Sequence, residues 1–312
     1  MRNANLSRIK QNMSDPDWIA ARLYNDRAYE GHPYALNSGG TLSTLASITP
    51  EMLRAYHQKY FTKNRLHIGV TGDITKEDLQ DIINSIFGNL PNGAPPKAMA
   101  PLDLKNQGGS FIYPIDIPQS VVNIAYPSIS IHDKDYFAAR VMNYILGGAG
   151  FGSRLMERAR EKEGLTYGIY SSLNHLSAID LLKISTSTQN ETREQMLGSI
   201  KDEIQQLIDH GVTETELQKA KDYLIGSLPL SLTSSDQISA LLLSLQLNDR
   251  DIDYLDHYAD QINRVTTKDI QSIAKIILDK KPLIIIVGKE DKIKNSPLTS
   301  SFTAIERLPN VE

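Results

Sequence analysis

The segment ITPEMLRAYHQKYFTKNRLHIGV at residues 48–70 returns as VTTKDIQSIAKIILDKKPLIIIV at residues 265–287. In each segment the second residue is a threonine that signals a helix start, and each segment closes with a short apolar run typical of a strand. The offset between the two segments is 265 − 48 = 217, and their apolar runs, which start at positions 66 and 283, give 217 again. This constant offset indicates an internal repeat of one helix-and-strand unit, with chance similarity as the alternative interpretation.

The repeat predicts two domains, and a linker between them is visible in the composition. The stretch PNGAPPKAMAPLDLKNQGG at residues 91–109 holds four prolines and three glycines without a helical or strand period. A twin of a domain that starts near Gly108 would start about 109 residues before Met1, so we expect the chain to begin inside its first domain. We therefore expect these parts: the carboxyl-terminal part of a first domain (1–92), a linker (93–108), a complete second domain (109–300) and a tail (301–312).

Strand-like and helix-like segments alternate along both predicted domains. The predicted strands cover residues 66–70, 111–115, 120–126, 165–173, 180–188 and 283–288. Amphipathic helices are expected from the first residues onward, after the caps Asp15 and Thr49, over 76–87, over 134–146, and through most of 189–278. This order predicts the fold class α/β (α+β), a mixed β-sheet flanked by helices.

Composition and charge exclude several classes of function. Lysine and arginine number 33 against 37 acidic residues, a net charge of −4 without a basic run, which argues against nucleic-acid partners. There is no cysteine, so thiolate metal sites and cysteine nucleophiles are excluded. The longest aliphatic run, Leu283 to Val287, is far too short to span a membrane, and the segment 1–18 lacks the apolar core of a secretory signal.

Several motifs that would identify an enzyme are missing from the sequence. The two histidines nearest to each other in sequence are His57 and His67, so no two histidines share a helical face, and neither HxxEH nor HExxH occurs. Neither a GxSxG elbow nor a GxxxxGK[ST] phosphate loop is present. The glycine-rich GGAGFG at residues 147–152 follows a predicted helix, the wrong context for a dinucleotide loop.

One stretch, GSRLMERAREKEGLTYGIYS at residues 152–171, resembles the second-domain signature of the pitrilysin/insulinase family of zinc metallopeptidases, the inverzincins. HPYALNSGGTLSTLASITPEMLRAYHQKYFTKNRLHIGVTGDI at 32–74 is similar to the end of the family's first domain, and GVTETELQKAKDYLIGSL at 211–228 to a helical region of the second. The resemblance implies tandem pitrilysin-like domains, of which the first is truncated here.

The resemblance also implies what this chain lacks. The family's zinc is held by an HxxEH helix, which by the repeat offset belongs to the missing half-domain, and by a glutamate further on. That glutamate would fall between Leu6 and Gln11, where there is no carboxylate and Arg8 is the nearest equivalent. We therefore expect no metal ligand and no cofactor in this chain, with zinc on a partner chain or on the missing half-domain.

Two residues match those that the family's second domain contributes to its site: Arg160 and Tyr167, seven positions apart. In that role the tyrosine hydroxyl donates to a carbonyl oxygen that gains charge, and the guanidinium clamps a substrate oxygen. The alternative interpretation pairs Arg160 with Glu157 or Glu163 on a solvated helix and makes Tyr167 a half-buried strand residue.

From the resemblance we expect the non-catalytic, peptide-binding half or subunit of a zinc metalloendopeptidase, with no catalytic residue of its own and with activity only beside a zinc-bearing partner. The alternative is a structural, non-proteolytic assembly subunit or an inactive gene fragment of the same family. The expected partners are a zinc-bearing family subunit or a second copy of the chain, and a peptide. The expected compartment is cytoplasmic by default, and periplasmic if the true amino terminus lies upstream.

Overall fold

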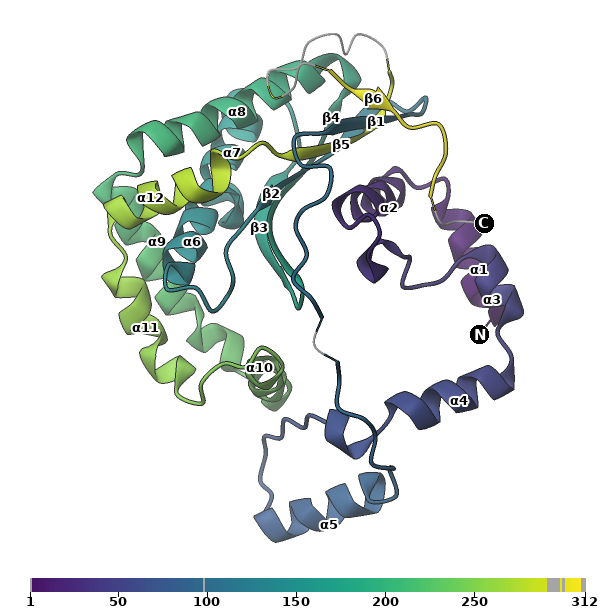
Figure 1. The fold of residues 1–312 in the computed structure, drawn as a ribbon. Helices are drawn as coiled ribbons and strands as arrows, with labels where there is room; N and C mark the ends of the chain where they lie inside the picture. The colour runs from purple at the N-terminus through teal and green to yellow at the C-terminus, as the bar shows by residue number, and fades with distance from the viewer. Residues whose placement is uncertain (1, 98, 291–297, 299–300, 310–312) are drawn as a thin grey trace. The chain divides into compact units, whose positions relative to one another are not determined.

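The computed structural model describes residues 2–97, 99–290, 298 and 301–309 (Figure 1). Packing divides the chain into two compact units. The sheet unit consists of Met1–Ala46, Ala100–Lys221 and Arg264–Glu312, and the helical unit consists of Ser47–Met99 and Asp222–Asn263. Each unit is built from segments that are far apart in the sequence.

A six-stranded mixed sheet organises the sheet unit, which confirms the predicted fold class. The strands are β1 (Ser110–Pro114), β2 (Gln119–Pro127), β3 (Ile169–Leu176), β4 (Ile179–Gln189), β5 (Leu283–Gly288) and β6 (Thr303–Ala304). Their order is β3-β4-β2-β5-β1-β6. β1 runs parallel to β5 and β6, whereas β2 runs antiparallel to β4 and β5, and β3 antiparallel to β4.

The central strand β5 explains why the sheet needs cover on both faces. All six of its residues are buried, as expected for a continuous apolar run between two neighbours and two packed layers. Its register places Ile286 opposite Val122 of β2 and Ile112 of β1. The sheet is therefore a layer inside the unit.

Helices α6 (Tyr136–Asn143), α8 (Arg193–His210) and α12 (Thr267–Leu278) lie on one side of the strands, and α2 (Pro16–Ala28) lies on the other (Figure 1). Asp15 caps α2: its Oδ1 accepts from the backbone nitrogen of Asp17 at 2.9 Å, and Pro16 follows at the first helical position. Ile19 and Leu23 of α2 pack against Leu283 and Ile285 in one apolar cluster. Residues of the predicted first domain thus cover the sheet of the predicted second one.

The chain also contains several shorter elements. The other α-helices of the sheet unit are α1 (Arg2–Asn12), α3 (Leu42–Ser47), α7 (Arg154–Met156) and α9 (Glu214–Ser227), the last of which runs on into the helical unit. Two π-helical segments cover Tyr144–Gly148 and Glu157–Lys162. Single 3-10 turns cover Pro33–Ala35, Gly150–Gly152 and Asn190–Thr192 in the sheet unit, and Lys63–Arg65 and Pro229–Leu232 in the helical unit.

The helical unit contains α4 (Pro50–Tyr60), α5 (Lys76–Phe87), α10 (Ser235–Leu247) and α11 (Tyr254–Arg264). The predicted strand over 66–70 is wrong, because this segment has no strand conformation. It lies against a helix: Gln246 Nε2 donates to the carbonyl oxygen of Ile68 at 3.2 Å, and a side chain at Gly69 would come within 2.6 Å of the Ser239 carbonyl. A strand needs a neighbouring strand for its backbone hydrogen bonds, and α10 offers none.

The predicted domain boundaries stay a prediction. The two units are defined by packing contacts, whereas the predicted domains are defined by a repeat in the sequence, so the first does not test the second. Ala98 in the predicted linker, the boundary at residue 300 and the end of the predicted tail, 310–312, lie outside the described residues. No helix within the described part of the chain is long and apolar enough to cross a membrane.

Candidate functional site

The segment that carries Arg160 folds as a π-helix, and this changes which side chains can meet. Residues Glu157–Lys162 form the π-helix, in which the main chain pairs residues five apart rather than four. Two ion pairs of this segment follow the same spacing: Lys162 Nζ lies 2.9 Å from Glu157, and Arg158 Nε lies 2.9 Å from Glu163. Glu157 and Glu163, the partners of Arg160 in the alternative interpretation, are therefore paired with other cations.

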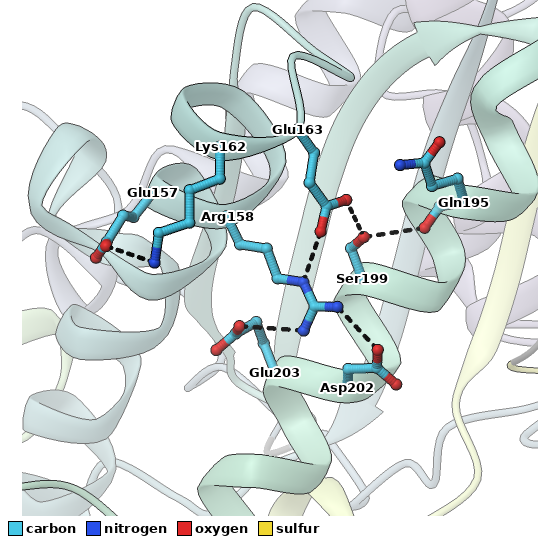
Figure 2. A network of polar contacts seen from close by, with 8 residues as sticks. All are labelled: Glu157, Arg158, Lys162, Glu163, Gln195, Ser199, Asp202 and Glu203. Carbon is cyan, nitrogen blue, oxygen red and sulfur yellow. Dashed lines mark hydrogen bonds and ion pairs between the residues drawn. The ribbon is translucent and has the colours of Figure 1, made fainter.

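A network centred on Arg158 fixes this segment to α8 (Figure 2). Besides Glu163, the guanidinium contacts Asp202 at 2.8 Å and Glu203 at 3.3 Å, both on α8. Ser199 of α8 donates to the other oxygen of Glu163. Burial raises the pKa of the Glu163 carboxyl, but hydrogen bonds from Ser199 and Arg158 outweigh it and leave that pKa below its usual value.

Arg160 lies outside this network. Its side chain is 34% exposed, and its guanidinium carbon lies 4.3 Å from the centroid of the Phe151 ring. The only carboxylate it approaches is Glu161, at 3.6 Å from Nε, within the part of the chain that the structure describes. A guanidinium over a ring uses its face for the cation–π contact, so N–H groups at its edge stay available to an oxygen.

Tyr167 precedes β3 and is 86% exposed, so the alternative of a half-buried strand residue is wrong. The turn around it is held by Thr166, whose hydroxyl donates to the Ser187 carbonyl at 2.7 Å and accepts from the Gly168 nitrogen at 3.0 Å. Because these bonds hold residues 166–168 in a turn, β3 begins at Ile169, and the predicted strand start at residue 165 is wrong. Within the described residues the Tyr167 hydroxyl has no hydrogen-bond partner.

Tyr167 lines a cavity of about 500 Å³ between the sheet and α2. The wall residues come from the turn at Tyr167, from β3, β4 and β2, and from the first turns of α2. Arg160 is not among them, so the structure does not bring the two motif residues into one cavity.

The sequence analysis did not identify the polar side chains that line this cavity beside Tyr167. They include Asn123, Lys183, Ser185 and Ser187. A signal was present: Lys183, Ser185 and Ser187 alternate with buried Leu182 and Ile184, which marks one polar face on a strand.

The described ranges contain no group of three or more histidine, cysteine, aspartate or glutamate side chains that could hold a metal ion. Arg8, where the resemblance would require a ligand, is an exposed residue of α1. The described residues therefore do not fit zinc.

Comparison with known proteins gives one consistent result. Residues 47–224 match the family described as the peptidase M16 inactive domain, and this range includes Arg160 and Tyr167. A Helicobacter pylori protein named non-peptidase homolog YmxG is 28% identical over 92% of this chain and 67% of its own length. An uncharacterised zinc protease of Streptomyces coelicolor is 24% identical over 92% of this chain and 64% of its own.

Among solved structures, the peptidase M16 inactive domain from Pseudomonas fluorescens superposes with a TM-score of 0.83 at 29% identity, covering 92% of this chain and 69% of that one. The chain spans about two thirds of the length of the relatives it matches.

Proposed function

Since this chain belongs to the peptidase M16 inactive-domain family, we propose that it is the non-catalytic, peptide-binding half of a zinc metalloendopeptidase of the pitrilysin/insulinase type. The zinc and the general base would reside on a partner chain or on a further half-domain. In the same proposal, residues 1–92 are the carboxyl-terminal part of the first tandem domain, and residues 109–300 are the complete second one.

The observation that carries the proposal is the position of Tyr167. Its side chain is 86% exposed at the edge of a polar cavity, and its hydroxyl has no partner among the described residues. A side chain placed in this way adds little to the stability of the fold. A neutral hydroxyl in such a place suits hydrogen bonding to a peptide carbonyl. Arg160 would supply a charged donor to a peptide oxygen from its position over Phe151.

A second candidate function is a structural, non-proteolytic subunit. It is favoured by the contacts of Arg160 with Phe151 and Glu161, which occupy this side chain within the fold. The name of the Helicobacter pylori relative, a non-peptidase homolog, agrees with this alternative.

The test measures peptide binding and cleavage with Tyr167→Phe and Arg160→Ala. Tyr56→Phe is the matched control, because Tyr56 is also an exposed tyrosine, 59% exposed, and lies in the other unit. With an HxxEH-bearing chain from the same genome, Tyr167→Phe should slow cleavage by about 10²- to 10³-fold, as other lost oxyanion donors do. Arg160→Ala should weaken peptide binding as well, because a charge-assisted hydrogen bond is lost.

Melting temperatures separate the two candidate functions. In the proposed function both variants melt like the unsubstituted chain. Normal cleavage by both variants, or activity that falls only in step with unfolding, would contradict the substrate roles of Tyr167 and Arg160 and assign a structural role to the turn that carries them.

A further inference from the structure

The cavity beside Tyr167 contains one basic side chain and one carboxylate, and the two do not meet. Lys183 projects from β4, and Asp17 lies in the first turn of α2. Asp17 is exposed, whereas Lys183 is partly buried. No ion pair joins them, so the carboxylate is solvated and does not neutralise the ammonium.

No carboxylate of the described residues pairs with the Lys183 ammonium. Its Nζ lies 4.6 Å from the centroid of the buried Tyr24 ring, a cation–π contact. Neither a hydrogen bond nor an ion pair from any described residue reaches this ammonium. Burial lowers the pKa of Lys183, since its charge lacks a full hydration shell. An ammonium in this environment gains strongly from an anion that enters the cavity.

A second donor lies on the neighbouring strand. Asn123 of β2 is 5% exposed and lines the same cavity. Its Oδ1 accepts from Ser185 Oγ at 2.8 Å, and its amide nitrogen donates to no described residue. This amide nitrogen is not one of the buried atoms without a partner, so it is open to the cavity and can donate to water or to a ligand.

We propose that this cavity binds a carboxylate of the peptide, through the Lys183 ammonium and the Asn123 amide. The inference rests on the proposed function and adds a substrate class to it: peptides with an acidic side chain or a free carboxyl terminus near the residue that contacts Tyr167. The carboxylate oxygens accept from the two donors, and the rings of Tyr167 and Tyr170 flank the neighbouring peptide atoms. A charge-assisted bond of this kind, partly open to water, should favour carboxylate-bearing peptides by about tenfold in Kd.

The experiment uses three pools of random octapeptides made from the same neutral residues. The first pool has a free carboxyl terminus, the second is amidated and carries one glutamate, and the third is amidated and carries no acid. Fluorescence anisotropy gives the Kd of each labelled pool for the full chain. The first two pools distinguish a terminal from a side-chain carboxylate, and at least one of them should bind about tenfold more tightly than the third.

Lys183→Met should remove that preference by weakening the acidic pools while leaving the neutral pool unchanged. Lys183→Gln is a second neutral variant, for use if the methionine lowers the melting temperature. Lys201→Met is the control, because Lys201 is an exposed lysine of α8. It should preserve the preference.

The outcomes separate this inference from the proposed function. An unsubstituted chain that binds all three pools equally, or a preference that survives in both Lys183 variants, overturns carboxylate recognition and leaves peptide binding standing. If no pool binds, both fail.

Discussion

The ion pair between Arg154 and Glu216 should make the largest contribution of any single ion pair to holding residues 152–171, the stretch that carries Arg160 and Tyr167, in place. Arg154 begins α7, just before Arg158 and Arg160, and Glu216 lies in the first turn of α9. The guanidinium makes two bonds to the carboxylate, at 2.7 and 2.9 Å, and a third to the Gly211 carbonyl at 3.0 Å. Two parallel bonds hold the segment in a defined orientation against α9.

The size of the effect follows from the titration of Glu216. Burial raises the pKa of Glu216, but bonds from Arg154 and from the Thr213 amide and hydroxyl outweigh it and lower that pKa from 4.5 to about 2. A fall of this size in pKa corresponds to roughly 3 kcal/mol of folding free energy. The side chain of Glu216 is 32% exposed, so solvent screening reduces the expected contribution to about 2 kcal/mol.

Glu216→Gln should therefore lower the free energy of unfolding by about 2 kcal/mol at pH 7. Because the folded pKa lies below the unfolded one, this stabilisation is present above pH 4.5 and is lost as the pH falls towards 2. The difference between the variant and the unsubstituted chain should shrink over that window. Glu306→Gln, at an exposed carboxylate, should have almost no effect at any pH.

Urea unfolding measures these differences, and hydrogen exchange of the β5 amides reports on the sheet unit separately. Arg154→Met and the double variant complete a cycle, in which the second substitution should cost little once the first is present. A Glu216→Gln deficit that stays constant between pH 7 and pH 2.5, or additive costs in the cycle, would refute the assignment of stability to this ion pair.

Three further outcomes are expected. Protein reconstituted with zinc should hold less than one zinc per chain by elemental analysis, and chelator-sensitive peptidase activity in the pure chain would contradict the proposed function. Ile82 and Ile86 on α5 are 47% and 63% exposed, so the chain should associate with itself or with a zinc-bearing chain through this face; sedimentation should show Ile86→Lys losing that association. Gly147→Ala should destabilise the fold by about 1–3 kcal/mol, because the new methyl group would lie 2.6 Å from the Ser171 nitrogen. Gly226→Ala is the control: it has open space around it, and thermal melting should show it to be neutral or stabilising.

Helix starts were predictable because their chemistry is local. Asp15, Thr49 and Thr266 each accept a hydrogen bond from a backbone nitrogen two or three residues later, so a few adjacent letters contain the whole interaction. The segment 66–70 shows the opposite case. Its apolar residues alternate with His67 and Gly69 as in a half-buried strand, but strand formation also requires a partner strand, which its own residues do not encode.

The site was predictable only in part, for a similar reason. The resemblance to the family predicts Arg160 and Tyr167 as site residues, which stays a prediction, and the exposure of Tyr167 agrees with a role outside the core. The partners of Arg160 were not predictable, because helical spacing of three or four residues was assumed and the π-helix pairs Glu157 with Lys162 instead. Lys183 became a candidate only when the fold placed α2 beside the polar face of β4.

The position of β5 has a consequence for how the protein is made. β5 lies between β2 and β1, yet it begins at Leu283, whereas β1 begins at Ser110, an offset of 283 − 110 = 173 along the chain. At a synthesis rate of roughly 5–20 residues per second, the ribosome needs about 9 to 35 s to add that length. During this interval α2 has no complete sheet to cover, and the inner edges of β1 and β2 await the strand that joins them. The nascent chain should therefore depend on chaperones until its carboxyl-terminal segment emerges, and ribosomes stalled before Leu283 should release chains that cells degrade.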